Sequence, residues 1–274
     1  MQKDTRNNFE AANCAVEQPA AKVAYQRLTA MLLAGKFSSG APVREATLAQ
    51  QLGFSRNAIR EALNRLVGID ILEYIPYCGY RLLPYTTRDV QEWLQYRLGL
   101  EPVALELFFE NSWCERERAF AEMGAILERE RQCIEEGNVS GIARCDFSFH
   151  LKIVENCGNR RIIGNYLCCS LPFLANITQM GEDGLVSEES DLCVNNLMSV
   201  DEQLHTNKRH FQLLEEMHYG EPAQAVELLR SHLTYSIKSI RNFLVRKAMD
   251  EMPNGSQQNA DTIGEIVAKL LDGC

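Results

Sequence analysis

The stretch from residue 48 to residue 66, LAQQLGFSRNAIREALNRL, most constrains what this chain can fold into. A short amphipathic segment ends at Gly53, and a second apolar stripe that includes Ile59 and Leu63 recurs after it at helical spacing. Gly53 permits the backbone of a tight turn, and Ser55 is a good N-cap for the following helix. We therefore predict two helices joined by a tight turn, which is the arrangement of a helix-turn-helix.

The polar face of the second helix predicts a contact with nucleic acid. Arg56, Asn57 and Arg60 point away from the apolar stripe and lie in the first two turns. A recognition helix uses these turns to reach base edges and phosphates in a major groove, where Arg suits guanine and Asn suits adenine. We expect these residues, together with Ser55, to bind double-stranded DNA.

Charge is divided unevenly along the chain. The formal net charge is −9, yet residues 21–85 hold eight Lys/Arg and four Asp/Glu, a net charge of +4. Because residues 1–20 carry −1, residues 86–274 carry −12. A small basic module joined to a large acidic one is typical of a DNA-reading domain attached to a domain that does not bind DNA.

A β-hairpin is predicted directly after the helix-turn-helix. The sequence ILEYIPYCGYRLLPY favours two short strands, Ile71–Ile75 and Tyr80–Leu83, joined by a turn that ends at Gly79. An earlier helix is predicted over residues 21–34, and the turn-rich segment GKFSSGAPV connects it to the helix-turn-helix. We therefore predict a winged helix-turn-helix domain over residues 21–85.

The longer part of the chain predicts an all-α antiparallel helical bundle over residues 86–247, so the protein as a whole is expected to be mainly α. Apolar periodicity interrupted by glycines and polar stretches gives six helices: 88–110, 115–136, 139–157, 159–180, 200–218 and 222–247. We expect residues 1–20 to be a disordered tail. Residues 248–274 are expected to form a linker and a short amphipathic helix.

Composition favours a cytoplasmic protein that does not enter a membrane. No run approaches the ~20 apolar residues of a membrane span. The N-terminal residues lack a basic head followed by an apolar core, so we expect no export signal. Ten cysteines are spread along the chain with no CxxC pair, and we expect them to be reduced.

The N-terminal motifs resemble the GntR family of bacterial transcription factors over about residues 20–85. The order LTAMLLAGKFSSGAPV, then LAQQLGFSRNAIREALNRL, then a hairpin with Gly79 at its tip carries this resemblance, and the SRxxxREAL core is its most diagnostic part. The chain departs from the family's pattern at two positions. Ala58 stands where the family often has Pro, and Ala46 stands where it often has Arg, so one customary DNA contact is either missing or moved to Arg44.

Histidines carry the chemistry of the acidic part of the chain. Asp146 and His150 are four residues apart, so one helical face presents both together with apolar side chains. His210 lies ten residues before Gly220 and His232 twelve residues after it. At 1.5 Å per residue these positions lie ~15 and ~18 Å along two antiparallel helices, so the two imidazoles are expected to face each other. The remaining histidines, His205 and His218, do not fit an inward stripe and are expected at the surface.

A divalent metal explains why one carboxylate and three imidazoles would enter a helical bundle. Without partners such groups are costly to bury. Three neutral imidazoles and one carboxylate suit zinc first, and also nickel, iron or manganese, and they leave coordination positions open. For a single histidine the alternative is a hydrogen-bonded core residue.

The same residues resemble the effector domain, named FCD, of the FadR-type branch of GntR regulators. DFSFH, GNRRI, RHFQLLEEM and LLRSHLTYS carry this resemblance over about residues 88–247. It implies that Asp146, His150, His210 and His232 are the metal ligands and that the effector domains help to form a homodimer. It also implies that Arg97 and Glu101, which match the family's R-x-x-x-E, belong to the effector-binding site, where the Arg helps to hold the carboxylate of the effector. The alternative for that pair is an exposed ion pair worth only ~0.3–0.5 kcal/mol.

These features favour a ligand-responsive transcription factor that binds an inverted-repeat operator as a homodimer and senses a small organic acid or sugar acid. The alternative is a hydrolase or oxygenase that uses the metal site, with the N-terminal domain localising it on DNA. We favour a non-enzyme because no further carboxylate or histidine is placed as a general base, and the basic module would be unexplained. A redox sensor using Cys168 and Cys169 is a third reading, although adjacent helical residues point apart.

Overall fold

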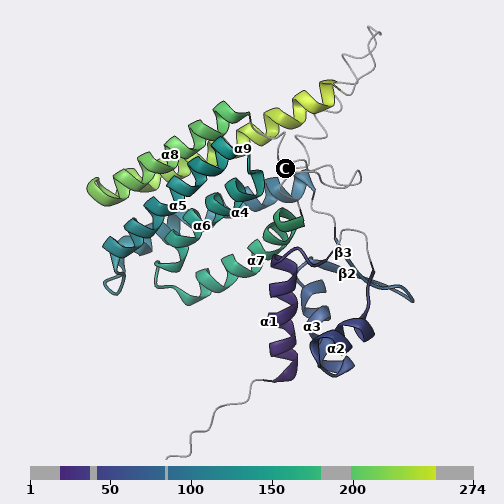
Figure 1. Cartoon of the computed structure of the whole chain (residues 1–274). Coiled ribbons are helices and arrows are strands. Elements are labelled where there is room, and N and C mark those ends of the chain that lie inside the picture. The colour runs from purple at the N-terminus through teal and green to yellow at the C-terminus, as the bar shows by residue number, and fades with distance from the viewer. Residues whose placement is uncertain (1–18, 38–41, 84–85, 180–198, 251–274) are drawn as a thin grey trace, which may run out of the picture.

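The computed structural model describes residues 19–37, 42–83, 86–179 and 199–250. Figure 1 shows two lobes, a small one that holds the N-terminal helices with the sheet and a larger helical one, with α7 between them. Most residues of the two segments predicted as a disordered tail (1–20) and as a linker with a short helix (248–274) lie outside the described residues. None of the described helices is long and apolar enough to cross a membrane.

The small lobe is a winged helix-turn-helix, as predicted. Its helices are α1 (Ala20–Leu33), α2 (Glu45–Leu52) and α3 (Arg56–Val67), and its strands are β1 (Pro42–Val43), β2 (Leu72–Ile75) and β3 (Gly79–Leu82). The strands form an antiparallel sheet in the order β1-β3-β2. Residues 42–43 lie in the segment predicted as a connector, because a strand of two residues is too short to show alternation in the sequence.

The turn between α2 and α3 has the expected local chemistry. Gly53 ends α2 with a φ of 71°, a left-handed conformation that glycine adopts without steric cost. Ser55 caps α3, and its Oγ accepts a hydrogen bond from the backbone N–H of Ala58 at 3.2 Å. Ile59 and Leu63 are fully buried against the other N-terminal helices and the sheet. The two helices are thereby held at a fixed angle, with the polar face of α3 outward.

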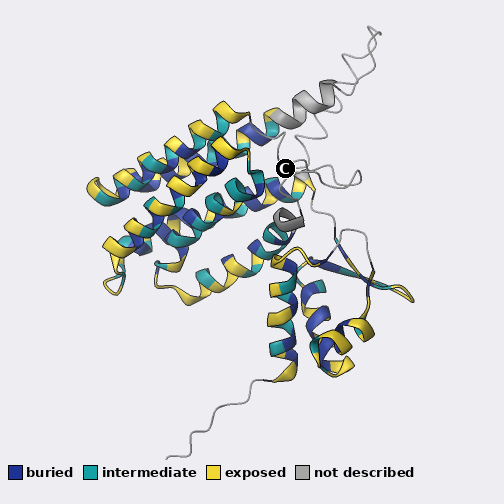
Figure 2. Ribbon diagram, viewed as in Figure 1, coloured by how far each residue is buried: buried dark blue, intermediate teal, exposed yellow. Residues whose placement is uncertain are grey.

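The large lobe is an all-α bundle, and each of its helices lies within a few residues of a predicted one. They are α4 (Thr87–Glu110), α5 (Arg116–Glu136), α6 (Val139–Glu155), α7 (Arg160–Gln179), α8 (Val200–Tyr219) and α9 (Pro222–Asp250). Thr86 starts α4 with a reciprocal capping box to Asp89, and Ser199 starts α8 in the same way. Figure 2 shows that the buried faces of these helices point toward one another.

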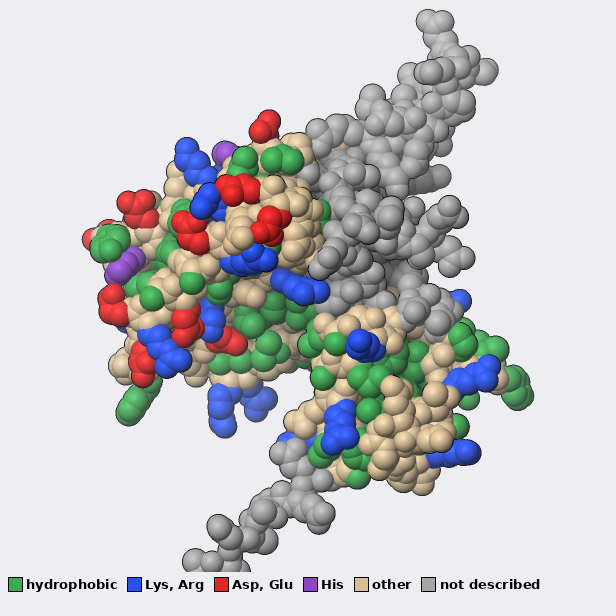
Figure 3. All heavy atoms as spheres, in the orientation of Figure 1, with side chains coloured by type: hydrophobic (Ala, Val, Ile, Leu, Met, Phe, Trp, Pro, Cys, Tyr) green, Lys and Arg blue, Asp and Glu red, His purple; other side chains and the backbone are tan. Residues whose placement is uncertain are grey.

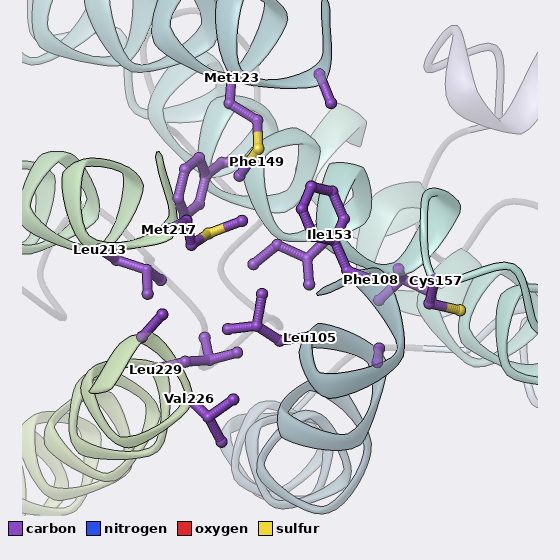
Figure 4. Close-up of a cluster of buried hydrophobic side chains, with 14 of the residues drawn as sticks. Leu105, Phe108, Met123, Phe149, Ile153, Cys157, Leu213, Met217, Val226 and Leu229 are labelled. Atoms are coloured by element: carbon purple, nitrogen blue, oxygen red, sulfur yellow. The ribbon is translucent and has the colours of Figure 1, made fainter. Parts of the chain in front are cut away.

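The core of the bundle lies where α4, α5, α6, α8 and α9 meet. Figure 4 shows Leu105, Phe149, Leu213 and Leu229 pointing into one cluster from four of these helices. His150 follows Phe149 directly and shares its burial, and His210 stacks at a tilt on the Phe149 ring. The apolar core therefore forms one wall of the polar cluster described next.

Helix α7 connects the two lobes. It contacts α1 on one side and α4 and α6 on the other. Ala175 belongs to the hydrophobic cluster of the small lobe and Leu171 packs against it, whereas Phe173 packs against the core of the bundle. One segment of five residues thus contacts both hydrophobic cores.

Candidate metal centre and nucleic-acid interface

Four side chains from three helices converge inside the bundle. Asp146 and His150 come from α6, His210 from α8 and His232 from α9, and one ligand atom from each lies within 4.8 Å of all the others. The Nε2 atoms of His210 and His232 are 3.1 Å apart. The turn at Gly220 brings these two imidazoles together at the same height, as the residue count predicted, with ring centroids 4.4 Å apart and ring planes tilted by 53°. All three histidines are buried, while Asp146 is partly exposed.

The spacing of these atoms fits a single divalent ion. Nε2 of His150 lies 3.2 Å from Nε2 of His210, and Oδ1 of Asp146 lies 3.5 Å from the same nitrogen of His210. Ligand atoms at ~2.0–2.1 Å from a metal are about 2.9 Å apart in octahedral geometry and about 3.3 Å apart in tetrahedral geometry. The donor set of three imidazoles and one carboxylate suits zinc, nickel, iron or manganese.

Two buried glutamates fix which nitrogen of the histidines faces the cluster. Nδ1 of His150 donates to Oε2 of Glu101 at 2.7 Å, and Nδ1 of His210 donates to Oε2 of Glu130 at 3.1 Å. Because Nδ1 carries the proton, each Nε2 presents a lone pair toward the other imidazoles. Lone pairs that face one another inside a protein need a shared cation, so this arrangement also fits a metal.

Sequence reasoning missed Glu130, which lies on α5. The signal was present in the apolar stripe of Met123, Leu127 and Ile134, since Glu130 falls on this stripe and is buried. A carboxylate on the inward face of a helix needs a partner. Its partners, His210 and Asn207, both come from α8, 80 and 77 residues further along the chain.

Arg97 and Glu101 form a buried ion pair and not an exposed one. Their exposed fractions are 3% and 0%, and Nε of Arg97 donates to Oε1 of Glu101 at 2.7 Å. Nη1 of Arg97 also donates to Oδ2 of Asp146 at 3.1 Å, and the hydroxyl of Tyr166 donates to Oε1 of Glu101 at 2.8 Å. Glu101 therefore uses both oxygens within the protein, whereas Nη2 of Arg97 has no hydrogen-bond partner among the described residues.

The charges of the cluster shift its pKa values. Burial opposes ionisation of Glu101 and Asp146, but the Arg97 guanidinium and neighbouring imidazoles outweigh it and lower the pKa of each carboxyl to about 2. Burial lowers the pKa of His232 well below its usual value, and the charges of His210 and His150 lower it further. Burial also lowers the pKa of His150, with Arg97 adding to the effect.

Glu101 and Glu130 add two negative charges to the surroundings of the four-residue cluster. Three carboxylates and one guanidinium leave two negative charges uncompensated when the imidazoles are neutral. A divalent cation would balance them, and buried charges without such balance are expensive. Burial opposes protonation of His210, but Glu130 raises the pKa of this imidazole above its usual value. Protonation of His210 would therefore oppose the binding of a metal ion.

The outer face of α3 carries the residues predicted to bind DNA. Arg56 and Asn57 are exposed, and Arg44 is exposed at the start of α2. Arg60 is exposed as well, but it makes a bidentate ion pair with Glu45, in which both N–O distances are 2.8 Å. In Figure 3 the lower lobe displays basic side chains, whereas the acidic ones gather on the bundle.

The hairpin has a different tip from the predicted one. Gly79 begins β3 with a φ of 95°, and a Cβ there would lie 3.1 Å from the carbonyl oxygen of Val43. The glycine thus allows β1 to approach β3. The turn itself is formed by residues 76–78, which are all exposed, and Tyr77 at its centre has a φ of 65°.

The remaining candidates lie apart from the cluster. His205 is exposed, and His218 pairs with Glu117 at 3.2 Å on the other side of the core. Cys168 and Cys169 are both free thiols, the first partly buried and the second exposed.

Comparison with known proteins gives a family match for each of the two lobes. Residues 20–81 match the profile described as bacterial regulatory proteins, gntR family, and residues 92–235 match the FCD domain. The chain is 31% identical over 139 residues to YdhC, an uncharacterized HTH-type transcriptional regulator of Bacillus subtilis, covering 50% of this chain and 61% of YdhC. It is 30% identical over 129 residues to a probable D-xylose utilization operon transcriptional repressor of Paenarthrobacter nicotinovorans, covering 47% of this chain and 55% of that protein. Each match therefore spans less than two thirds of the relative.

Solved structures share the fold. Escherichia coli McbR/YncC superposes with a TM-score of 0.58 at 22% identity, over 82% of this chain and 99% of that chain. A putative GntR regulator from Rhodococcus sp. RHA1 superposes with a TM-score of 0.57 at 17% identity, over 81% of this chain and 96% of that one.

Proposed function

Because the chain belongs to the GntR family of bacterial regulatory proteins and carries an FCD domain, we propose that it is a DNA-binding transcription regulator whose activity depends on a small carboxylate bound at a metal centre. The observation that carries this proposal is the convergence of His150, His210, His232 and Asp146 beside the free Nη2 of Arg97, in the same chain as an exposed basic recognition helix. In this proposal residues 21–85 bind DNA and residues 86–247 hold the metal and the effector.

On the DNA side, Arg56 and Asn57 reach base edges while Arg44 and Arg60 contact phosphates. Ser55 fixes the start of the recognition helix, and the hairpin that begins at Gly79 lies along the neighbouring backbone or minor groove. One such module reads too few base pairs for selectivity, so a homodimer binds an inverted repeat. The relative from Paenarthrobacter is named as a repressor of an operon, which supports a regulatory role for this chain.

On the effector side, the metal is held by Asp146, His150, His210 and His232, with Glu101 and Glu130 orienting two of the imidazoles. When bound, a divalent metal supplies open positions that accept oxygen donors. Arg97 is fixed by Glu101 and Asp146 and presents its remaining N–H groups to the carboxylate of the effector. In this proposal Glu101 therefore acts through Arg97 and His150 and does not bind the effector directly.

A metal-dependent hydrolase or oxygenase is the second candidate. The donor set alone would allow it, but the two carboxylates behind the cluster, Glu101 and Glu130, each accept a hydrogen bond from an imidazole and are therefore not free to act as a general base. Turnover of small esters, amides and 2-oxo acids by the metal-loaded protein at a rate that His150→Ala abolishes would favour this candidate.

The DNA half of the proposal is tested by selection from a random double-stranded library with the full chain. We expect one enriched inverted repeat. Arg56→Ala and Asn57→Ala should each weaken binding to it by at least fivefold, because a good base contact contributes ~1–3 kcal/mol. Arg230→Ala, which removes an exposed positive charge from α9, is the matched control and should bind normally. The DNA half is wrong if no sequence is enriched or if all three variants bind alike.

A further inference from the structure

A cavity of about 140 Å³ opens beside the metal cluster. Helices α4, α5, α6, α8 and α9 line it together with α7, and Arg97, Asp146 and Glu130 place one end of it at the cluster. For comparison, a protein cavity of about 150 Å³ lined by apolar side chains holds one benzene molecule. A ligand in this cavity is therefore small.

The end next to the metal cluster is polar. Thr206 on α8 lies one turn before His210, and Ser236 on α9 lies one turn after His232, so both flank the cluster. Oγ1 of Thr206 and Nη2 of Arg97 are buried and have no partner within the described part of the chain. Two buried donors without a partner indicate a ligand oxygen at this end, because such groups are costly to leave unsatisfied.

The far end is mainly apolar. Gln203, one turn before Thr206 on α8, is a polar side chain there, and Trp93 on α4 adds an indole ring to the lining. On α4, Leu94 and then Val90 follow Arg97 toward the helix start, and on α9, Ile240 lies one turn beyond Ser236. On α6, Ala143, Ile142 and Val139 lie before Asp146, toward the start of the helix. Phe173 of α7 also lines this end of the cavity. A ligand that fills the cavity therefore needs an apolar body. The hydroxyl groups of a sugar acid would meet few partners there.

The charge of the site limits the ligand to one carboxylate. The divalent ion and Arg97 together carry +3, and Asp146, Glu101 and Glu130 together carry −3. One ligand carboxylate can accept hydrogen bonds from the free N–H groups of Arg97 and occupy an open position on the metal. Its binding leaves the site with one uncompensated negative charge. A second carboxylate would lie among the aliphatic side chains of the far end, unpaired.

From these features we infer that the effector is a monocarboxylate with a compact apolar body of about six carbon atoms, either aryl or branched alkyl. This inference rests on the proposed function, because it names the class of carboxylate that the same site takes. The carboxylate lies against Arg97, Thr206 and the metal, and the body lies between Leu94, Ile142 and Phe173.

The test is calorimetric titration of the metal-loaded full chain with a series of acids: acetate, propionate, butyrate, 3-methylbutyrate, benzoate, succinate and gluconate. We expect affinity to rise along the series up to 3-methylbutyrate or benzoate. The rise should be about fourfold per added carbon, because burial of one CH₂ group contributes about 0.8 kcal/mol. Succinate and gluconate should bind at least tenfold more weakly than benzoate. Benzamide, which keeps the ring and loses the charge, should also bind at least tenfold more weakly.

A matched pair of variants locates the apolar body. Ala143→Leu adds three carbons at the far end and should weaken benzoate binding about tenfold, while acetate binding stays unchanged. Ala121→Leu, at an exposed position on α5, makes the same substitution away from the cavity and should change neither. The acid series on the unmodified chain gives an answer even if Ala143→Leu does not fold.

Two results would overturn this inference, and only the second would also overturn the effector half of the proposed function. Binding of gluconate or succinate tighter than that of benzoate, with no rise along the acid series, would refute the apolar monocarboxylate and leave a carboxylate-sensing regulator in place. Absence of binding by every acid, in a metal-loaded chain that still binds its selected DNA site, would refute both this inference and the effector half of the proposed function.

Discussion

Oε2 of Glu101 lies 2.7 Å from Nδ1 of His150, and both side chains are fully buried. The carboxylate holds the imidazole in the tautomer that points its Nε2 lone pair into the cluster. Glu130 does the same for His210. These two glutamates therefore orient two of the imidazoles toward the position that a metal would take.

Removal of either carboxylate charge should weaken metal binding. We expect Glu101→Gln and Glu130→Gln each to lower zinc affinity about 10–100-fold, the usual effect of losing such a partner, with the ligand set still intact. Competition with a chelating dye measures this. Glu128→Gln, at an exposed position on the same helix as Glu130, is the control and should leave zinc affinity unchanged. Equal affinities in all three variants would contradict the orienting role.

The buried carboxyl of Glu101 should also make the metal-free protein acid-sensitive. Its pKa is lowered from 4.5 to about 2, because Arg97 and His150 outweigh the effect of burial. A depressed pKa contributes stability that is fully present above pH 4.5 and is lost as the pH falls toward 2, here about 3 kcal/mol. In urea titrations across this range, the free energy of unfolding of Glu101→Gln should fall less steeply than that of the unmodified chain. Glu106→Gln, which is exposed on the same helix, should follow the unmodified chain.

The ion pair between Arg60 and Glu45 should restrain DNA binding. Arg60 is bound through both nitrogens of its fork and must leave Glu45, or share it, to reach a phosphate. We expect Glu45→Gln to strengthen binding to the selected DNA site more than Glu61→Gln does, although both substitutions remove one negative charge near the recognition helix. Fluorescence anisotropy measures both. Equal gains would show that only the net charge matters and that Arg60 stays on Glu45.

Helix α7 should carry the response from the effector cavity to the DNA-binding lobe. Phe173 lines the cavity, and Leu171 packs against the core of the N-terminal lobe two residues earlier. An effector changes DNA affinity only if it favours one arrangement of these contacts over another. Leu171→Ala should keep benzoate affinity within about twofold and should reduce the change in DNA affinity that benzoate causes. Leu167→Ala, exposed on the same helix, should respond as the unmodified chain does. An unchanged response in Leu171→Ala would exclude this route.

Local chemistry explains which features the sequence could predict. The cap at Ser55, the turn at Gly53 and the facing of His210 and His232 follow from neighbouring residues or from a count along two helices, and the structure has all of them. The environment of Arg97 does not follow from its helix. The i to i+4 spacing to Glu101 is the same for an exposed pair and a buried one, and only contacts with other helices decide between them.

Features that depend on distant parts of the chain could not be predicted in this way. The partners of Glu130 lie on α8, and Glu45, which holds Arg60, comes from a neighbouring helix 15 residues away. Strand β1 exists because Gly79 leaves room for the carbonyl of Val43 on an adjacent strand. In each case the role of a residue depends on a contact with another helix or strand, and nothing in the sequence of either segment indicates that the two are in contact.

Native mass spectrometry of the purified full chain, followed by elemental analysis, tests the metal centre most directly. We expect about one divalent ion per chain, and we expect His150→Ala, His210→Ala and His232→Ala to lose it and to melt several degrees lower, since the ligands that remain become unpaired polar groups in a bundle. His205→Ala, at the exposed histidine of α8, should keep both the ion and the melting temperature. A chain that is free of metal as isolated, does not take up zinc, nickel, iron or manganese on titration, and melts at the same temperature as the three ligand variants would contradict the account.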